Sequence, residues 1–369
     1  DPATIAAIEN GRERHAAEVR ADNAARLEWF IQRFEAIDRG ETRDDTFDAL
    51  LFSGGGEWGA FGAGYMAEWA ELGDDAAVPI PEFDLVGGIS TGALMAAYVA
   101  SGELERYRGL ETFYRSVSPD WIERRSILSL LFPSTVSLVD NSGVREQVEV
   151  AVDDALIAEL RAAYADGRRI EVGTANLDYG GRRYWNVGEI AADDAEPKDR
   201  IVDTLMAATA IAGIFPPEEI DGALHADLGY VEGIPAFRGT GIEAFEAAWR
   251  GRNGERVPPT MRLWLVYNIA IGVEPKPVEL SVLPLAKSGY DALVQASFSN
   301  PVNFALLMGR VTEQTKTPPL EVRWIAIPPS FEPPEDAVAF DPRSANRLAD
   351  MGREAARQPD GGWRRDSPD

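Results

Sequence analysis

The chain has 369 residues, of which 45% are hydrophobic and 26% are charged, so it is long enough to bury a large core. Its formal net charge of −25 argues against nucleic acid as a partner and disfavours tight adsorption to an anionic lipid surface. The absence of cysteine excludes disulfides, thiolate catalysis and cysteine-based zinc sites. No apolar run reaches the roughly 18 residues of a membrane-spanning helix, so no transmembrane segment is predicted.

Residues 1–45 are predicted to form an N-terminal helical extension. Its apolar residues fall on one stripe of a helix, with spacings of three, one, three and three: Leu27, Phe30, Ile31, Phe34 and Ile37. This stripe predicts a helix that packs onto the main domain. The chain begins with Asp1 rather than Met, which leads us to expect that an N-terminal segment was cut off, either by processing or by cloning, and favours export or an envelope location over the cytoplasm.

From residue 47 onwards, short apolar runs alternate with helical patterns. The predicted strands are 49–53, 83–87, 170–175, 183–187, 261–271 and 322–328. The predicted helices are 58–72, 92–100, 151–166, 201–210, 241–249, 286–296, 302–314 and 344–357. This alternation predicts an α/β domain over residues 46–357 with a parallel, mostly buried sheet. The polar, Gly- and Pro-bearing residues 358–369 are predicted to be a disordered tail.

The first candidate for chemistry is the run Gly88-Ile89-Ser90-Thr91-Gly92, between a predicted strand and a predicted helix. This G-x-S-x-G pattern is typical of a nucleophile elbow, a sharp turn that exposes the serine hydroxyl. Gly88 and Gly92 fit because side chains there would collide where strand and helix meet. The amides at the start of the following helix favour negative charge. An ordinary glycine-rich turn remains the alternative, since the pattern alone is weak.

The second candidate is the loop Ser53-Gly54-Gly55-Gly56-Glu57-Trp58-Gly59. Successive glycines let backbone amides converge on a developing oxyanion, which makes Gly54, Gly55 and Gly56 candidate donors. The loop also fits the dinucleotide fingerprint G-x-G-x-x-G, which implies a nucleotide-binding oxidoreductase. That alternative needs an acid at the end of the next strand, where this chain instead has Ser90. Asp84 lies near the beginning of that strand.

A base for Ser90 is the third requirement. The chain has only two histidines, His15 and His225, and neither follows Asp227. An ordinary Ser-Asp-His order is therefore hard to build. We expect His15 to be a surface residue of the N-terminal helix. His225 precedes Asp227 by two residues on one presumed strand, which favours a neighbouring or tuning role over a catalytic one.

Four ordered motifs give the chain a specific resemblance over residues 47–235. They are the glycine loop, the elbow, the run AATAIAGIFPP at 207–217 and the D-x-G string at Asp227, and the run EVGTANL at 171–177 adds to them. Together they resemble the patatin-like phospholipase family. The resemblance implies a three-layer α/β/α sandwich with a mostly parallel central sheet, and hydrolysis of lipid acyl esters by a Ser–Asp dyad without histidine.

Carried over, the resemblance makes Ser90 the nucleophile, Asp227 the base and Gly54, Gly55 and Gly56 the oxyanion hole. It implies a lipid or small ester substrate and leaves room for peripheral contact with a membrane. It implies no cofactor and no metal, in keeping with the absence of a His/Asp/Glu cluster at ligand spacing.

One departure from the family pattern leaves alternatives open. The family usually has D-G-G or D-G-A, whereas Asp227 is followed by Leu228 and Gly229. Asp221 begins a literal D-G-A string and is the second candidate for the base. A patatin-like protein that binds lipid but has lost activity is therefore the alternative function. The apolar, Pro-broken residues 126–139 are read either as a flap over an acyl groove or as a buried connection.

Overall fold

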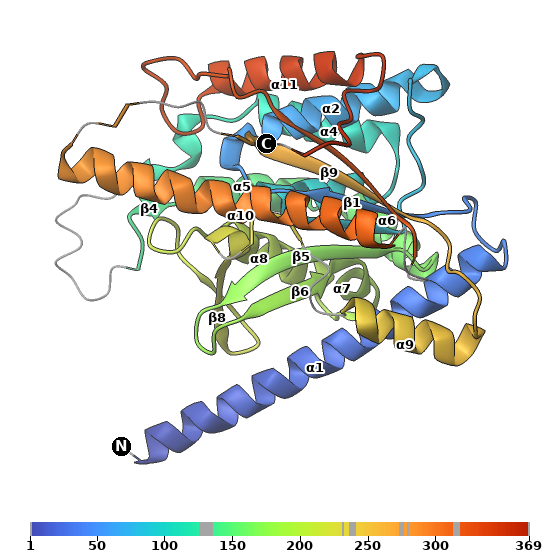
Figure 1. Cartoon of the computed structure of the whole chain (residues 1–369). Coiled ribbons are helices and arrows are strands. Elements are labelled where there is room, and N and C mark those ends of the chain that lie inside the picture. Colours follow the sequence, from blue (N-terminus) through green and yellow to red (C-terminus); the bar gives the residue numbers. More distant parts are fainter. Residues whose placement is uncertain are drawn as a thin grey trace.

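A mixed central sheet organises the chain (Figure 1). A computed structural model describes residues 2–124, 136–230, 232–235, 241–272, 277–278, 280–312 and 318–367. Within them the sheet has eight strands: β1 (Phe47–Phe52), β2 (Leu85–Ile89), β5 (Arg169–Asn176), β6 (Arg182–Asn186), β7 (Glu218–Ile220), β8 (Ala223–Asp227), β9 (Met261–Ala270) and β10 (Leu320–Ile327). Their order is β10-β9-β1-β2-β5-β8-β7, and β6 also pairs with β5.

The five strands from β10 to β5 are mutually parallel, whereas β6 and β8 run antiparallel to β5 and β7 runs antiparallel to β8. Every residue of β1 and of β2 is buried. A parallel strand covered on both faces reads as a continuous apolar run, which is why these strands were recognisable in the sequence. The carboxyl ends of β1 and β2 meet at one edge of the sheet, where Phe52 pairs with Gly88.

Helices cover both faces of the sheet and give three layers. One face carries α2 (Ala60–Leu72), α3 (Thr91–Val99), α4 (Leu104–Arg115), α5 (Ser142–Ala151), α6 (Asp154–Ala165), α7 (Val187–Asp193), α8 (Pro197–Thr209) and α11 (Pro342–Ala356). The other carries α1 (Pro2–Asp38), α9 (Ile242–Asn253) and α10 (Val282–Thr312). A hydrophobic core lies on each face of the sheet, and alternate residues of β1 pack into one or the other. Leu50 and Phe52 face α2, and Ala49 and Leu51 face α1. The predicted α/β/α sandwich is confirmed.

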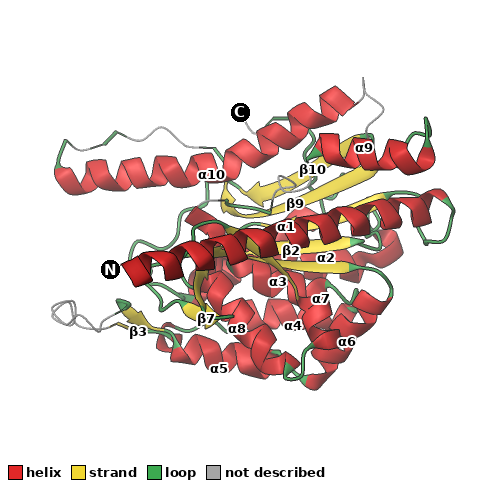
Figure 2. Cartoon of the chain, turned by 90° about the horizontal axis from the view of Figure 1, so that it is seen from below, coloured by secondary structure: helices red, strands yellow, loops and turns green. Residues whose placement is uncertain are grey.

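Helix α1 crosses the face of the sheet, as Figure 2 shows from below. Its stripe from Phe30 to Ile37 is buried against β1 and α9, as the spacing predicts. Farther back along the helix, Arg26 forms an ion pair of 2.7 Å with Glu171 of β5, and both side chains are almost fully buried. Breaking one partner of such a pair leaves an uncompensated buried charge, so α1 is fastened to the sheet by charge as well as by packing.

The prediction of a disordered tail is wrong for its described part, residues 358–367. Trp363 is buried against Tyr65, Trp69 and Trp264 with edge-to-face ring contacts. The backbone of Arg364 exchanges two hydrogen bonds with that of Trp324 in the edge strand β10, at 2.8 and 3.0 Å. One large aromatic side chain and a short backbone ladder hold a segment whose composition is otherwise polar.

One further difference concerns the helices around Pro301. The sequence predicts separate helices at 286–296 and 302–314, but α10 runs through Pro301 without a break. A proline removes one backbone donor, and here the helix continues because its following turn is packed into the core at Val302.

Of the segment 126–139, residues up to 135 lie outside the described residues. The rest leads into the short strand β4 (Val139–Asp140), which pairs with β3 (Glu123–Arg124).

Candidate active site

Ser90 lies on a sharp turn between β2 and α3, as the elbow motif predicts. Its backbone has φ 56° and ψ −129°, a conformation that residues other than glycine rarely adopt. A Cβ on Gly88 would lie 1.8 Å from the carbonyl oxygen of Gly92, and a Cβ on Gly92 would lie 2.6 Å from that of Phe52. Both positions therefore require glycine. The turn leaves the Ser90 side chain at the carboxyl edge of the sheet with 7% of its surface exposed.

Asp227 reaches Ser90 because β2 and β8 converge along one edge of β5. Ile89, the last residue of β2, pairs with Gly173, and Asp227, the last residue of β8, pairs with Thr174. The other edge of β5 is taken by β6 at the same positions. The two strands thus run toward each other, and their carboxyl ends meet on adjacent residues of β5.

The Asp227 carboxylate is buried beside Ser90. It accepts a hydrogen bond of 2.7 Å from the backbone amide of Gly229, and the Ser90 hydroxyl lies close enough to stabilise its ionised form. Burial raises the pKa of Asp227 to about 6, although Ser90 and the Gly229 amide act in the opposite direction. A carboxylate with such a pKa is a stronger proton acceptor than an exposed aspartate and is still ionised at neutral pH.

The glycine loop follows β1 and lies beside Ser90. A Cβ on Gly54 would lie 3.2 Å from Ser90 Cβ. The described residues provide no acceptor for the amides of Gly55 and Gly56, whose φ values are 154° and 60°. The amide of Gly54, in contrast, donates to the carbonyl oxygen of Gly233 at 3.0 Å. This bond differs from the expectation that all three amides are available to an oxyanion and leaves Gly55 and Gly56 as the candidates.

Asn268 of β9 supports this loop and was not identified from the sequence. Its backbone amide donates to Ser53 Oγ at 2.9 Å, and its side-chain amide donates to the Ser53 carbonyl at 3.1 Å. Its carbonyl oxygen lies so close to Gly55 that a Cβ there would approach it to 2.3 Å. The one signal in the sequence was a polar residue inside a predicted buried strand, which does not by itself distinguish a support from an interruption.

The structure does not bring Asp221 to Ser90. Asp221 lies in the tight turn between β7 and β8, with φ 56°, at the far end of β8 from Asp227. Its side chain is about half exposed, and both carboxylate oxygens accept from Nη2 of Arg200 at 2.7 Å. The literal D-G-A string is therefore a hairpin turn, in which Asp and Gly suit the positive φ values.

Among the described contacts, neither histidine is hydrogen-bonded to Ser90. His225 Nδ1 is hydrogen-bonded to Thr174 Oγ1 at 3.0 Å, and the ring packs edge-on against Trp185. Burial, assisted by the nearby charge of Arg183, lowers the pKa of His225 to about 4, so the ring is neutral at pH 7. His15 was expected at the surface, but it is nearly buried and stacks on Tyr179.

Two properties of the described residues concern metal binding and membrane insertion. They contain no group of three or more His, Asp or Glu side chains arranged to hold a metal ion. No helix among them is long and apolar enough to cross a membrane.

A serine on a strand-to-helix elbow, next to a buried carboxylate and to loop amides for which the described residues provide no acceptor, is the kind of site that serine hydrolases use. Comparison with known proteins agrees. Residues 50–238, about half of the chain, match the family model described as patatin-like phospholipase, and the chain belongs to this family. Membership supports lipid acyl hydrolase activity in general. A crystal structure of VipD from Legionella pneumophila is similar with 12% identity and a TM-score of 0.40, covering 86% of this chain and 67% of VipD. The comparison with curated proteins gave no match.

Proposed function

We propose that the protein hydrolyses carboxylic ester bonds of lipids, in the manner of a phospholipase A, with Ser90 as nucleophile and Asp227 as base. The observation that carries this proposal is the position of the Ser90 hydroxyl beside the buried Asp227 carboxylate, close enough to lower the pKa of that carboxylate. A hydroxyl next to a carboxylate of raised pKa can pass its proton to it and attack when a substrate carbonyl comes within reach.

In the first step, Ser90 Oγ bonds to the acyl carbon while its proton passes to Asp227. The carbonyl oxygen becomes an oxyanion, and the amides of Gly55 and Gly56, which have no acceptor among the described residues, are suited to donate to it. The proton then goes from Asp227 to the leaving alkoxide, and the acyl-enzyme remains. In the second step, water loses its proton to Asp227 and attacks the acyl carbon. Collapse of that intermediate returns the proton to Ser90 and releases the fatty acid.

The alternative of an inactive lipid-binding relative rested on Leu228 after Asp227. Leu228 is fully buried, and its side chain lies against Gly173 next to the Ser90 elbow. Gly229 still donates its amide to Asp227. The departure from D-G-G therefore leaves the aspartate held and oriented, which favours an active hydrolase over an inactive lipid-binding protein.

A fluorophosphonate probe tests the proposal directly. It should label the purified protein once, and mass spectrometry should locate the adduct on Ser90. Turnover of a chromogenic ester, and its loss after labelling, would tie the adduct to hydrolysis. Absence of both labelling and turnover in a folded protein would favour the inactive lipid-binding alternative. Binding of a nicotinamide or flavin nucleotide instead would favour the oxidoreductase.

A further inference from the structure

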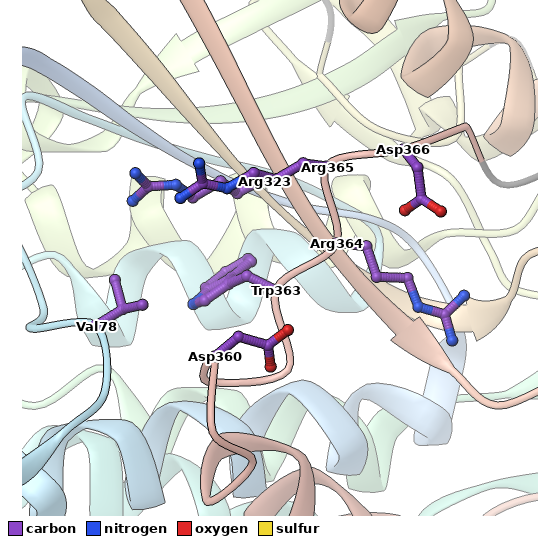
Figure 3. Close-up of a pocket in the computed structure, with 7 residues that line it drawn as sticks. All are labelled: Val78, Arg323, Asp360, Trp363, Arg364, Arg365 and Asp366. Carbon is purple, nitrogen blue, oxygen red and sulfur yellow. The ribbon is translucent and has the colours of Figure 1, made fainter.

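A pocket of about 600 Å³ opens on the edge strand β10, where the chain end crosses it (Figure 3). It is lined by Val78, Arg323, Asp360, Trp363, Arg364, Arg365 and Asp366. Three strand spacings separate β10 from β2, which ends at Ser90. At about 4.8 Å per spacing, the pocket lies roughly 14 Å across the sheet from that strand. It is thus separate from the candidate active site.

Arg323 provides an incompletely satisfied charge in this pocket. Its side chain is only 12% exposed, and its guanidinium lies over the ring of Trp264 at 4.4 Å. One terminal nitrogen, Nη2, donates to the half-exposed Glu321 at 3.1 Å, whereas Nε is buried without a hydrogen-bond acceptor. Burial, followed by the charge of Arg365, lowers the pKa of Arg323. A buried donor without an acceptor is costly unless a ligand or water supplies one.

Arg365 places a second guanidinium beside the first. Figure 3 shows the two groups side by side, with the carboxylates of Asp360 and Asp366 directed elsewhere. Arg365 forms no ion pair with any carboxylate that the structure describes. The buried Asp48 stabilises the Arg323 charge from a distance, but both of its oxygens are hydrogen-bonded to Arg262 at 2.7 Å. Of the two guanidiniums, only Arg323 has an ion-pair partner among the described residues, the half-exposed Glu321, so the pair can accept a further counter-charge.

We propose that this pocket binds a phosphate-type oxyanion between Arg323 and Arg365. Two guanidinium groups offer several donors in a planar arrangement that suits phosphoryl oxygens, and the bound charge would relieve their mutual repulsion. The unpaired Nε of Arg323 would donate one of the bonds. Free phosphate and the phosphodiester of a lipid headgroup share this chemistry.

Calorimetric titration with inorganic phosphate at constant ionic strength tests the site, with glycerophosphocholine as the headgroup probe. Measurements on Ser90→Ala protein keep them independent of the proposed hydrolysis. We expect saturable binding of at least one probe, weakened at least about tenfold by Arg365→Gln, because a charge-assisted contact is lost. The stronger of the two probes identifies the source of the phosphoryl group.

Arg364→Gln is the matched control. Arg364 lines the same segment, but its guanidinium lies on the ring of Trp324 at 5.0 Å and points away from the pair in Figure 3. Its removal should leave the affinity within about twofold of the parent protein. Arg323→Gln should weaken binding like Arg365→Gln, and since Arg323 is buried, the exposed Arg365 keeps the test valid if that variant unfolds. Binding of neither probe, or equal affinity in Arg365→Gln, would overturn the proposal.

Discussion

Ser90 directly follows β2, and Asp227 is the last residue of β8. These two strands run toward each other along the same edge of β5. Ile89 pairs with Gly173 and Asp227 with Thr174, so neighbouring residues of one strand hold the two sides of the site. The separation of hydroxyl and carboxylate is therefore fixed by backbone hydrogen bonds and not by long flexible side chains. Preorganisation of this kind suits the proposed roles of Ser90 as nucleophile and Asp227 as base.

Replacing Ser90 by Ala should abolish ester hydrolysis and fluorophosphonate labelling while folding is preserved. Alanine has the same Cβ as serine, so the strained backbone at φ 56° is no worse in the variant. Activity and labelling of the purified variant, with its melting temperature as the control, check this outcome. Labelling of a different serine with undiminished turnover would refute the assignment of Ser90.

Gly55→Ala should lower kcat by about 10²–10³, the usual cost of losing one oxyanion donor. The new methyl group would meet the carbonyl of Asn268 at 2.3 Å and turn the loop amides away. Gly102→Ala is the control, because Gly102 also has a positive φ but open space around it. That variant should lose about 1 kcal/mol of stability and keep its kcat. A folded Gly55→Ala protein with normal kcat would remove the loop from catalysis.

Asp227→Asn should reduce kcat by several orders of magnitude without unfolding the protein, because the amide keeps the shape but cannot accept the serine proton. His225→Ala should keep substantial activity, since the ring is bonded to Thr174 instead of Ser90. Asp221→Asn should change stability through the lost Arg200 contact more than the rate per folded molecule. The comparison requires kcat and melting temperature for all three. An inactive His225→Ala beside an active Asp227→Asn would exclude the histidine-free dyad.

The pH dependence separates the same candidates without mutation. If Asp227 is the base, kcat/KM should fall about tenfold per pH unit below its pKa of about 6 and reach a plateau above it, because only the carboxylate accepts a proton. If His225 were the base, the limb would lie near its lowered pKa of about 4. Rates on an uncharged ester across this range give the answer, and a single limb near 4 would contradict the proposed base.

Folding must be monitored in that experiment, because His225 also links stability to pH. Its pKa is about 4 in the folded protein and about 6.5 in an unfolded chain. The unfolded state therefore binds more protons between these values. The corresponding stability is present above pH 6.5 and is lost as the pH falls toward 4. Circular dichroism at each pH distinguishes this loss of folded protein from titration of the base.

The sequence predicted the local parts of the site well and its long-range parts poorly. The elbow and its glycines could be predicted, because the collision between Gly88 and Gly92 is decided within five residues. The choice between Asp221 and Asp227 could not be made from spacing, since it depends on which end of β8 meets β2. The bond from the Gly54 amide to Gly233 is likewise a contact between segments far apart in the chain. Composition misjudged the tail, because one buried tryptophan outweighs its polar neighbours.

Trp363 tests that last point. Trp363→Ala should cost about 3–5 kcal/mol of unfolding free energy, the usual range for deleting a large aromatic side chain from a core. The ring is 5% exposed and lies edge-on to Tyr65, Trp69 and Trp264, so its loss opens a cavity between the tail and α2. Urea unfolding measures the change, with Val338→Ala, at an exposed apolar position, as the control that should shift little. Activity per folded molecule should stay near normal, because β10 and the tail lie three strands from β2. An unchanged midpoint for Trp363→Ala would mean that the tail does not pack on the domain in solution.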